Sequence, residues 1–286
     1  MHAEILSCQV CGSAYFDSVY PKQHPGLKIC RQCGFVFFDR TPSMEQLIAH
    51  YKTYPRHDEI SPITLKRFDE IVESFAPYRK LNRILDVGCG NGHLLQAAMR
   101  QGWEAHGTEF TDEAVSICSS KGILIKKGIL DVSNYPAESF DVICFIEVIE
   151  HIQNTREELA KFHRLLRKGG LLYITTPNFR ALSGKFAGPA WNIIEYPEHL
   201  AYFRTTTLHR ILTDAGFRKQ SLKTTGFSYN RLLQSRDTNN PSPTVDETLR
   251  EKTETRPVYK FAKKTINALL SYTNSGDTIK GVYIKN

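Results

Sequence analysis

The stretch LDVGCGNG occupies residues 85–92 and is the most informative segment of this 286-residue chain. The apolar run Arg83–Val87 predicts a short buried strand, and the residues from Gly92 onward have the spacing of a helix. Glycines at alternate positions, Gly88, Gly90 and Gly92, let the backbone approach a ligand closely, and the start of the next helix adds exposed N–H groups. The segment therefore predicts a strand, loop and helix that together hold a small cofactor.

The chain beyond this loop alternates predicted strands with predicted helices. The alternating pattern predicts further strands at 104–109, 123–127, 140–146, 171–175, 219–225 and 278–284, and it predicts helices at 92–101, 112–120, 155–166, 205–215 and 258–270. The run FDVICFI at 140–146 is apolar throughout, as expected for a strand buried on both faces. We expect an α/β fold with a Rossmann-like, seven-stranded, mostly parallel sheet that carries helices on both faces.

Four of the seven cysteines form two close pairs near the N-terminus, Cys8 with Cys11 and Cys30 with Cys33, with 18 residues between the pairs. Two CxxC turns at this separation suit a tetrahedral site of four thiolates around zinc. The first residues show no secretion signal, so we expect zinc rather than disulfides, and a cytoplasmic location. Because four cysteines close the coordination of zinc, the site should be structural.

These patterns predict three parts. We expect a zinc ribbon at residues 1–40, a helical linker or lid at 41–80, and an α/β domain at 81–286 with a polar insertion at about 235–256. In the linker, Tyr51 and Tyr54 either close over the cofactor or pack as ordinary aromatic side chains.

The charge distribution argues against nucleic acid as the partner. The formal net charge is +7, but the excess lies in residues 216–286, which carry 13 Lys/Arg and 6 Asp/Glu. The ribbon segment carries four Lys/Arg and three Asp/Glu, which is a weak electrostatic footprint for phosphates. We expect a small-molecule substrate and neither a nucleic acid nor a membrane as partner.

The glycine spacing at residues 85–92 is GxGxG, whereas dinucleotide-binding loops have GxGxxG, and an acidic residue stands two positions before the first glycine. The segment resembles the first motif of class I S-adenosylmethionine-dependent methyltransferases, and the similarity extends over residues 81–286. The resemblance implies that the loop binds S-adenosylmethionine through Asp86, Gly88, Gly90 and Gly92.

The same resemblance places further cofactor residues. In that family an acidic residue at the end of the second strand binds both ribose hydroxyls, and Glu109, followed by Phe110, stands at that place. An aspartate after the third strand binds the adenine amino group, which implies Asp131 and the adjacent Val132. The sequence FDVICFIEVIEHI resembles the family's fourth strand and its end, and it implies that Glu147 lies beside the methionine part of the cofactor.

A second segment, EYPEHLAYF at residues 195–203, follows the fifth predicted strand. It resembles the Glu-His-x-x-Tyr-Phe pattern of sugar C-methyltransferases that also carry an N-terminal four-Cys zinc module. In those enzymes the histidine is the base and the glutamate assists it, which implies that His199 is the base and Glu198 its partner. An alternative is that this segment only lines the substrate pocket. Those enzymes have a further large C-terminal domain that has no counterpart in this sequence. Because the resemblance is incomplete in this respect, we expect oxygen to be as good a candidate acceptor as carbon.

We therefore expect a methyltransferase that acts on a small molecule, with a sugar nucleotide or polysaccharide precursor as the leading class. One alternative is a methyltransferase of ribosomal or transfer RNA, although the chain has no Asn/Asp-Pro-Pro-Tyr-like motif after the fourth strand and no Pro-Cys pair. Another is a non-catalytic protein that binds the cofactor or docks on a partner. The acceptor atom and the oligomeric state stay open.

Overall fold

The structure is a computed structural model that describes residues 3–43, 46–47, 50, 58, 60–227 and 257–286. Tyr51, Tyr54 and the polar insertion at about 235–256 lie outside the described residues. No helix within the described ranges is long and apolar enough to cross a membrane.

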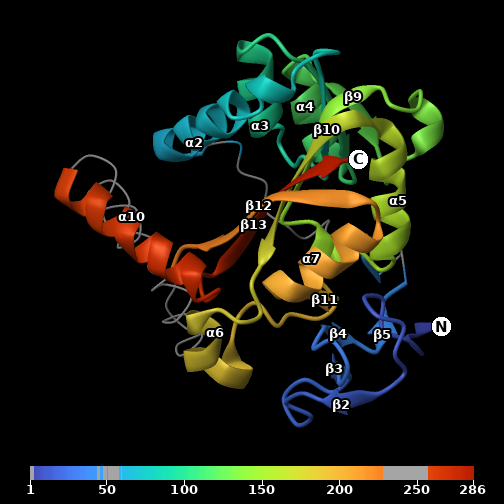
Figure 1. Cartoon of the computed structure of the whole chain (residues 1–286). Helices are drawn as coiled ribbons and strands as arrows, with labels where there is room; N and C mark the ends of the chain where they lie inside the picture. The colour runs from blue at the N-terminus through green and yellow to red at the C-terminus, as the bar shows by residue number, and fades with distance from the viewer. Residues whose placement is uncertain (1–2, 44–45, 48–49, 51–57, 59, 228–256) are drawn as a thin grey trace. The chain divides into compact units, whose positions relative to one another are not determined.

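A seven-stranded sheet is the main element of the fold, with the strand order β12-β13-β10-β9-β6-β7-β8 (Figure 1). Its strands are β6 (Arg83–Val87), β7 (Glu104–Glu109), β8 (Leu124–Lys127), β9 (Phe140–Ile146), β10 (Leu166–Pro177), β12 (Phe217–Thr225) and β13 (Thr278–Lys285). The pairs β10–β9, β9–β6, β6–β7 and β7–β8 are all parallel. The predicted α/β fold with a mostly parallel seven-stranded sheet is therefore confirmed.

The helices follow the predicted segments closely, except that no pattern predicted the short helix at Leu182–Ala187. They are α2 (Pro62–Glu73), α3 (His93–Arg100), α4 (Asp112–Ser120), α5 (Thr155–Leu165), α6 (Leu182–Ala187), α7 (Thr205–Asp214) and α10 (Pro257–Tyr272). Strand β10 differs most from its prediction, because it begins at Leu166 and not at Leu171. The Lys168-Gly169-Gly170 segment before the predicted start lies inside the strand, where the pairing with β9 shifts register between Leu166 and Leu171. A β-bulge absorbs the extra residues without ending a strand.

The chain divides into two compact units. The first comprises Met1–Ser43, Thr176–His209 and Leu222–Lys280, and the second comprises Met44–Thr175, Arg210–Ser221 and Gly281–Asn286. The boundaries predicted at residues 40 and 80 stay predictions.

The second unit contains an apolar core built from α2, α3 and the central strands, in which Ile84, Leu95 and Val142 are fully buried. A buried ion pair anchors the strands beside this core. The Asp141 carboxylate accepts hydrogen bonds from the backbone N–H groups of Leu81 and Asn82, both at 2.7 Å, and from Arg167 Nε at 2.5 Å. It thereby joins the start of β6 to the start of β9.

The first unit contains a four-stranded sheet in the order β11-β4-β3-β2. Its strands are β2 (Phe16–Ser18), β3 (Leu27–Cys30), β4 (Val36–Phe38) and β11 (Ala201–Tyr202), and nearby β1 (Ala3–Glu4) pairs with β5 (Arg40–Thr41). The first three strands come from the segment predicted as a zinc ribbon. The fourth comes from residues 201–202, far along the chain, and the sequence offered no sign of it.

Candidate functional site

The glycine loop after β6 is a tight turn that requires glycine. Gly88, Gly90 and Gly92 have φ angles of 73°, 53° and 75°, in the left-handed region that side chains disfavour. A Cβ at Gly92 would overlap Ile123 and lie 2.9 Å from Cys118 Sγ. The backbone N–H groups of Gly88 and Cys89 both donate to the Thr108 carbonyl, at 2.9 and 3.0 Å, and fold the loop against the end of β7.

Helix α4 holds the far side of this loop through two carbonyl oxygens. The Cys118 thiol donates to the Gly90 carbonyl at 3.2 Å, and Lys121 Nζ donates to the Asn91 carbonyl at 2.9 Å. Lys121 Nζ also lies 2.6 Å from Asp58 Oδ1. Lys121 and Asp58 were not predicted, because no local pattern shows that a lysine at the end of one helix reaches a loop 30 residues earlier.

Glu109, at the end of β7, is attached directly to the glycine loop. Its side chain is 7% exposed, and its Oε2 accepts the backbone N–H of Gly90 at 3.0 Å. Its Oε1 accepts the N–H of Thr111 at 3.1 Å and the Thr111 hydroxyl at 3.3 Å. Thr111 is the N-cap residue of α4, but its hydroxyl binds Glu109 and does not cap the helix. The carboxylate is therefore held beside the loop in one orientation.

Asp86 places a second carboxyl group beneath the loop. The residue is 4% exposed, and burial raises its pKa well above the ordinary value, with further contributions from the nearby Cys118 and Glu109. Among the described residues, no hydrogen-bond donor reaches its side-chain oxygens. A buried carboxyl group without a donor suits a ligand that brings a cationic donor of its own.

Glu147 follows β9 and has a φ angle of 53°, which is unusual for a residue other than glycine. Its Oε1 accepts a hydrogen bond from Thr175 Oγ1 at 2.7 Å, and its backbone N–H donates to the Thr175 carbonyl at 3.0 Å. The next residue, Val148, abuts the glycine loop, because a Cβ at Gly88 would lie 2.8 Å from Val148 Cγ2. The carboxyl end of β9 and the loop after β6 are therefore neighbours.

The residues expected near adenine lie at the ends of β7 and β8. Asp131 is exposed and caps the short helix η2 (Val132–Asn134), and the N–H of Ser133 at 2.9 Å lowers the pKa of its carboxyl group. Val132 and Phe110 are half-buried. The two strand ends are linked by the Gly128 N–H, which donates to the Glu109 carbonyl at 2.8 Å. The predicted cofactor residues thus gather at the carboxyl edge of β6, β7, β8 and β9, where open α/β sheets bind ligands.

His199 lies in the first compact unit, in a setting that determines the tautomer of its ring. Its Nδ1 lies 2.7 Å from the Ile193 carbonyl oxygen, which can only accept a hydrogen bond, so Nδ1 carries the proton. In the neutral ring Nε2 is then the basic nitrogen. Glu198 is 8% exposed, and Tyr202 donates its hydroxyl to the His199 carbonyl at 3.1 Å. Trp191 and Tyr202 are each 3% exposed, so both pack in the interior.

The four N-terminal cysteines gather at one point. Their Sγ atoms all lie within 4.8 Å of one another, with Cys8 to Cys33 at 3.6 Å and Cys11 to Cys30 at 3.5 Å. Sulfur atoms around a tetrahedral zinc with Zn–S bonds of about 2.3 Å are about 3.8 Å apart. None of the four forms a disulfide.

The two CxxC turns share a backbone conformation, but the acidities of their thiols differ from one cysteine to another. Gly12 and Gly34, which follow the second cysteine of each pair, both have φ angles of 75°. Burial raises the pKa of Cys8 and raises that of Cys33 to about 11. At Cys30, burial is outweighed by hydrogen bonds from the backbone N–H groups of Cys33 and Gln32, which lower its pKa to about 7.

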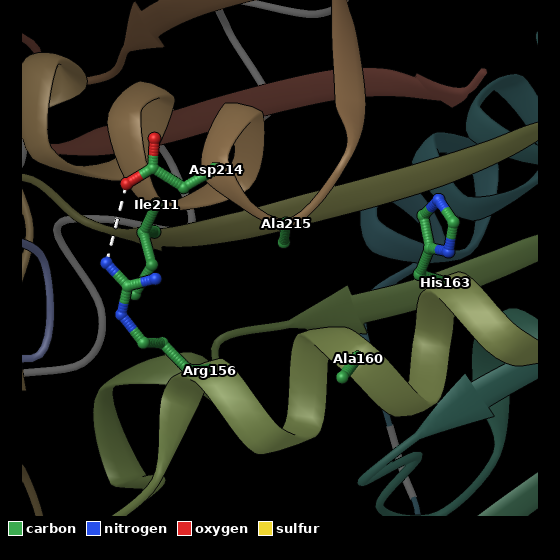
Figure 2. A pocket seen from close by; sticks show the side chains of 6 residues that line it. All are labelled: Arg156, Ala160, His163, Ile211, Asp214 and Ala215. Atoms are coloured by element: carbon green, nitrogen blue, oxygen red, sulfur yellow. Dashed lines mark hydrogen bonds and ion pairs between the residues drawn. The ribbon is translucent and has the colours of Figure 1, made fainter.

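A pocket of about 290 Å³ lies elsewhere, between α5 and the end of α7 (Figure 2). Arg156 and Asp214 face each other across it at 3.4 Å, and His163 lies further along α5. Its lining is Arg156, Ala160, His163, Ile211, Asp214 and Ala215. No predicted site residue is among them, so this pocket is separate from the candidate cofactor site.

Comparisons with known proteins agree with this geometry. Residues 57–222 match the family model described as a methyltransferase domain. The ubiquinone biosynthesis O-methyltransferase of Thiobacillus denitrificans is 27% identical over 193 residues, which cover 63% of this chain and 80% of that protein. The protein of the same name from Parvibaculum lavamentivorans is 30% identical over 178 residues, 57% of this chain and 69% of that protein.

Solved structures show the same fold at low sequence identity. A methyltransferase from Archaeoglobus fulgidus that depends on S-adenosylmethionine has a TM-score of 0.52 and 18% identity, and the match covers 77% of this chain and 94% of that one. Another, from Thermotoga maritima, has a TM-score of 0.50 and 16% identity, covering 85% and 97%.

Proposed function

The chain belongs to the methyltransferase domain family and is an S-adenosylmethionine-dependent methyltransferase, and we propose that it methylates a hydroxyl oxygen of a small molecule. The family model spans more than half of the chain and includes the glycine loop and His199. The relatives from Thiobacillus denitrificans and Parvibaculum lavamentivorans are named O-methyltransferases, which supports oxygen over carbon as the acceptor.

We assign the cofactor to the carboxyl edge of β6 to β9, where the residues present fit it. The orphaned, buried carboxyl group of Asp86 matches the ammonium of the methionine part, and Glu147 lies at the same edge. The Glu109 carboxylate, which the N–H groups of Gly90 and Thr111 hold in place, can accept hydrogen bonds from both ribose hydroxyls. When bound, the cofactor supplies an electrophilic methyl group on a sulfonium. The full proposed set is Asp86, Gly88, Gly90, Gly92, Glu109, Phe110, Asp131, Val132 and Glu147.

The single observation that carries the proposed chemistry is the hydrogen bond from His199 Nδ1 to the Ile193 carbonyl. It leaves Nε2 as the nitrogen that takes a proton, which is what the base for a hydroxyl nucleophile requires. With the cofactor bound, the sulfonium would supply its methyl carbon to the hydroxyl oxygen, and the sulfur would keep the electron pair of the broken carbon–sulfur bond. The hydroxyl proton passes to His199 Nε2 and then to solvent. We assign Glu198 as the partner of His199.

Within small molecules, a sugar nucleotide or polysaccharide precursor is our leading substrate class, because EYPEHLAYF resembles the corresponding segment of sugar methyltransferases. The two relatives, which are named for ubiquinone biosynthesis, make hydroxyl groups of other ring systems the second class to test. Cytoplasmic location stays a prediction.

An RNA substrate is the weaker alternative. The ribbon segment has only one more basic than acidic residue, which gives little attraction for phosphates. One edge of its sheet, along β4, is also occupied by the chain's own β11. That edge cannot pair with another macromolecule.

We also propose that Cys8, Cys11, Cys30 and Cys33 bind one structural zinc ion. The sulfur–sulfur distances and the absence of disulfides support this assignment. Metal analysis of the purified protein should find one zinc per chain, and the Cys8→Ser/Cys30→Ser variant should lose it. Retention of a full equivalent of zinc by that variant would place the ligands elsewhere.

The function is tested by transfer of a labelled methyl group from S-adenosylmethionine to a panel of nucleotide sugars, phenols and RNA. We expect an oxygen-methylated small molecule, and His199→Ala should abolish turnover while the affinity for S-adenosylhomocysteine stays the same. His163→Ala, which changes a histidine of the separate pocket, is the matched control. Labelled RNA, a carbon-methylated product or normal turnover by His199→Ala would each refute the corresponding part of the proposal.

A further inference from the structure

We propose that the zinc ribbon is the scaffold that positions His199, because residues 189–204, here called the histidine segment, fold onto the ribbon as part of its sheet and core. The inference rests on the proposed function only in taking His199 as the base. It gives the ribbon a role within the enzyme, as a part that makes the catalytic segment rigid. All the contacts that carry it lie within the first compact unit.

Backbone pairing joins the histidine segment to the ribbon beside His199. Strand β11 pairs antiparallel with β4, with Ala201 opposite Phe37 and Tyr202 opposite Val36. The Phe38 N–H donates to the Leu200 carbonyl at 3.0 Å, one residue after His199. The ribbon sheet therefore extends to the residue next to the proposed base. A two-residue strand has few hydrogen bonds of its own, so its position depends on the strand that it joins.

Side chains of the ribbon and of the histidine segment form one shared core. Its fully or nearly fully buried members are Leu27, Val36 and Phe38 from the ribbon and Trp191, Ile193, Ile194 and Tyr202 from the histidine segment, together with Ala181. A chain of about 40 residues is too small to bury a stable core alone. Each part thus supplies the apolar surface that the other must cover.

Two residues of this shared core, Ile193 and Tyr202, contact His199 directly. The Ile193 carbonyl that binds His199 Nδ1 belongs to a residue of the shared core. Tyr202 packs edge-on against both Phe38, with ring centroids 6.2 Å apart, and His199, at 6.3 Å. Its hydroxyl donates to the His199 carbonyl at 3.1 Å. Both the ring and the backbone of His199 are held by residues that pack against the ribbon.

The four cysteines fix the ribbon strands that make these contacts. Cys30 ends β3, and its N–H donates to the Phe35 carbonyl at 2.8 Å, immediately before β4. The Gly34 N–H donates to the Cys30 carbonyl at 2.9 Å. At the end of the histidine segment, Arg204 packs against the same turn, since a Cβ at Gly34 would lie 2.8 Å from its Nη1. Loss of the metal should loosen β3, β4 and then the segment that they hold.

The tryptophans allow a direct test. The chain has two, and Trp103 lies in the core of the second unit while Trp191 lies in the shared core. In a Trp103→Phe background, emission therefore reports on the histidine segment alone. Removal of zinc by a chelator, or by Cys8→Ser/Cys30→Ser, should shift this emission to the red. Affinity for S-adenosylhomocysteine should stay within about twofold, because the cofactor residues belong to the other compact unit and such units open separately.

Nuclear magnetic resonance of the ten histidine rings gives a second readout that needs no substrate. With histidine labelled at Cε1, the signal lost in His199→Gln identifies His199. Zinc removal should move that signal toward the chemical-shift position of an exposed histidine. Unchanged Trp191 emission and an unchanged His199 signal after zinc loss would overturn the proposal, as would loss of cofactor binding in the same step.

A variant series separates positioning from simple destabilisation. Phe38→Ala should shift the His199 signal and lower kcat with KM for S-adenosylmethionine unchanged, and Phe38→Leu should restore both. Tyr15→Ala, which changes an aromatic residue of the ribbon that is 73% exposed, is the control and should do neither. If His199→Ala keeps normal turnover while zinc removal still moves Trp191 and His199, then the scaffold stands and only the assignment of the base fails. A normal His199 signal in Phe38→Ala would contradict the scaffold itself.

Discussion

Thr175 and Glu147 are joined twice, by a side-chain hydrogen bond of 2.7 Å from Thr175 Oγ1 to Glu147 Oε1 and by a backbone hydrogen bond of 3.0 Å from Glu147 N to Thr175 O. The pair links the carboxyl ends of β9 and β10 and holds Glu147 at a φ angle of 53°. A strained backbone of this kind persists only where its surroundings determine it. The two residues therefore fix a carboxylate at the edge of the sheet that we assign to the cofactor.

Thr175→Val tests this relationship, because valine keeps the shape of threonine and removes only the hydroxyl. A hydrogen bond to a charged group is worth about 1.5–3 kcal/mol, so we expect about tenfold or greater loss of affinity for S-adenosylhomocysteine by calorimetry. Thr206→Val, at an exposed position of α7, is the control. Unchanged affinity in Thr175→Val would remove Glu147 from the proposed cofactor site.

Asp86→Asn should weaken the binding of the cofactor, and it should stabilise the folded protein when no cofactor is bound. Burial raises the pKa of Asp86 in the folded state above its ordinary value of 3.8, so ionisation of this group opposes folding. The stability difference between Asp86→Asn and wild type should thus be small at pH 4 and below, and it should grow as the pH rises above about 4. Thermal unfolding across this range measures it. A variant less stable than wild type at pH 7 would show that the folded protein stabilises the ionised carboxylate.

Gly92→Ala should disrupt the glycine loop. The new Cβ would overlap Ile123 and approach Cys118 Sγ to 2.9 Å, on a backbone with a φ angle of 75°. We expect a loss of stability of about 1–3 kcal/mol from overpacking, with reduced cofactor affinity. Gly128→Ala separates the two causes, because its φ angle is 104° but nothing lies within 4 Å of its Cβ position. If denaturant unfolding shows equal losses for both variants, then backbone strain alone accounts for the effect and the crowding at Gly92 does not matter.

Lys121→Met should weaken the binding of the cofactor indirectly, because Lys121 holds the backbone of the glycine loop. The ammonium binds the Asn91 carbonyl at 2.9 Å and Asp58 Oδ1 at 2.6 Å, and methionine keeps most of the side-chain length without these bonds. We expect about a threefold to tenfold loss of affinity for S-adenosylhomocysteine, the usual effect of one or two hydrogen bonds, and partial recovery in Lys121→Arg. Lys127→Met is the matched control, since the ion pair of Lys127 with Asp112 is exposed and should contribute little to cofactor affinity. Equal affinities for the Lys121→Met and Lys127→Met variants would show that the Lys121 contact does not shape the loop.

Much of the sheet was predictable because its signals are local. The runs at Arg83–Val87 and Phe140–Ile146 are largely apolar over lengths typical of buried strands, and the structure places strands at these bounds. The glycines of the loop and the two CxxC turns are equally local, since each requires a particular backbone conformation or ligand spacing within a few residues. The convergence of the four cysteine sulfurs follows from that spacing.

The misses have a common physical origin. Strand β10 extends five residues earlier than expected, because its neighbour β9 supplies hydrogen bonds that let the glycine turn join the strand as a bulge. Strand β11 has two residues and therefore no periodicity to detect, and it exists because β4 offers an open edge. In both cases a partner distant in sequence decides the local structure.

The sequence by itself determined the fold class, the glycine loop and the cysteine cluster, because apolar periodicity, glycine backbone freedom and ligand spacing act over a few residues. Only the tertiary structure decided what surrounds the candidate site residues. The Ile193 carbonyl that determines the tautomer of His199, the Thr175 hydroxyl on Glu147, and Lys121 behind the loop all depend on how separate segments pack. Such pairings arise from burial and from the need to satisfy polar groups in three dimensions, which no short stretch of sequence specifies.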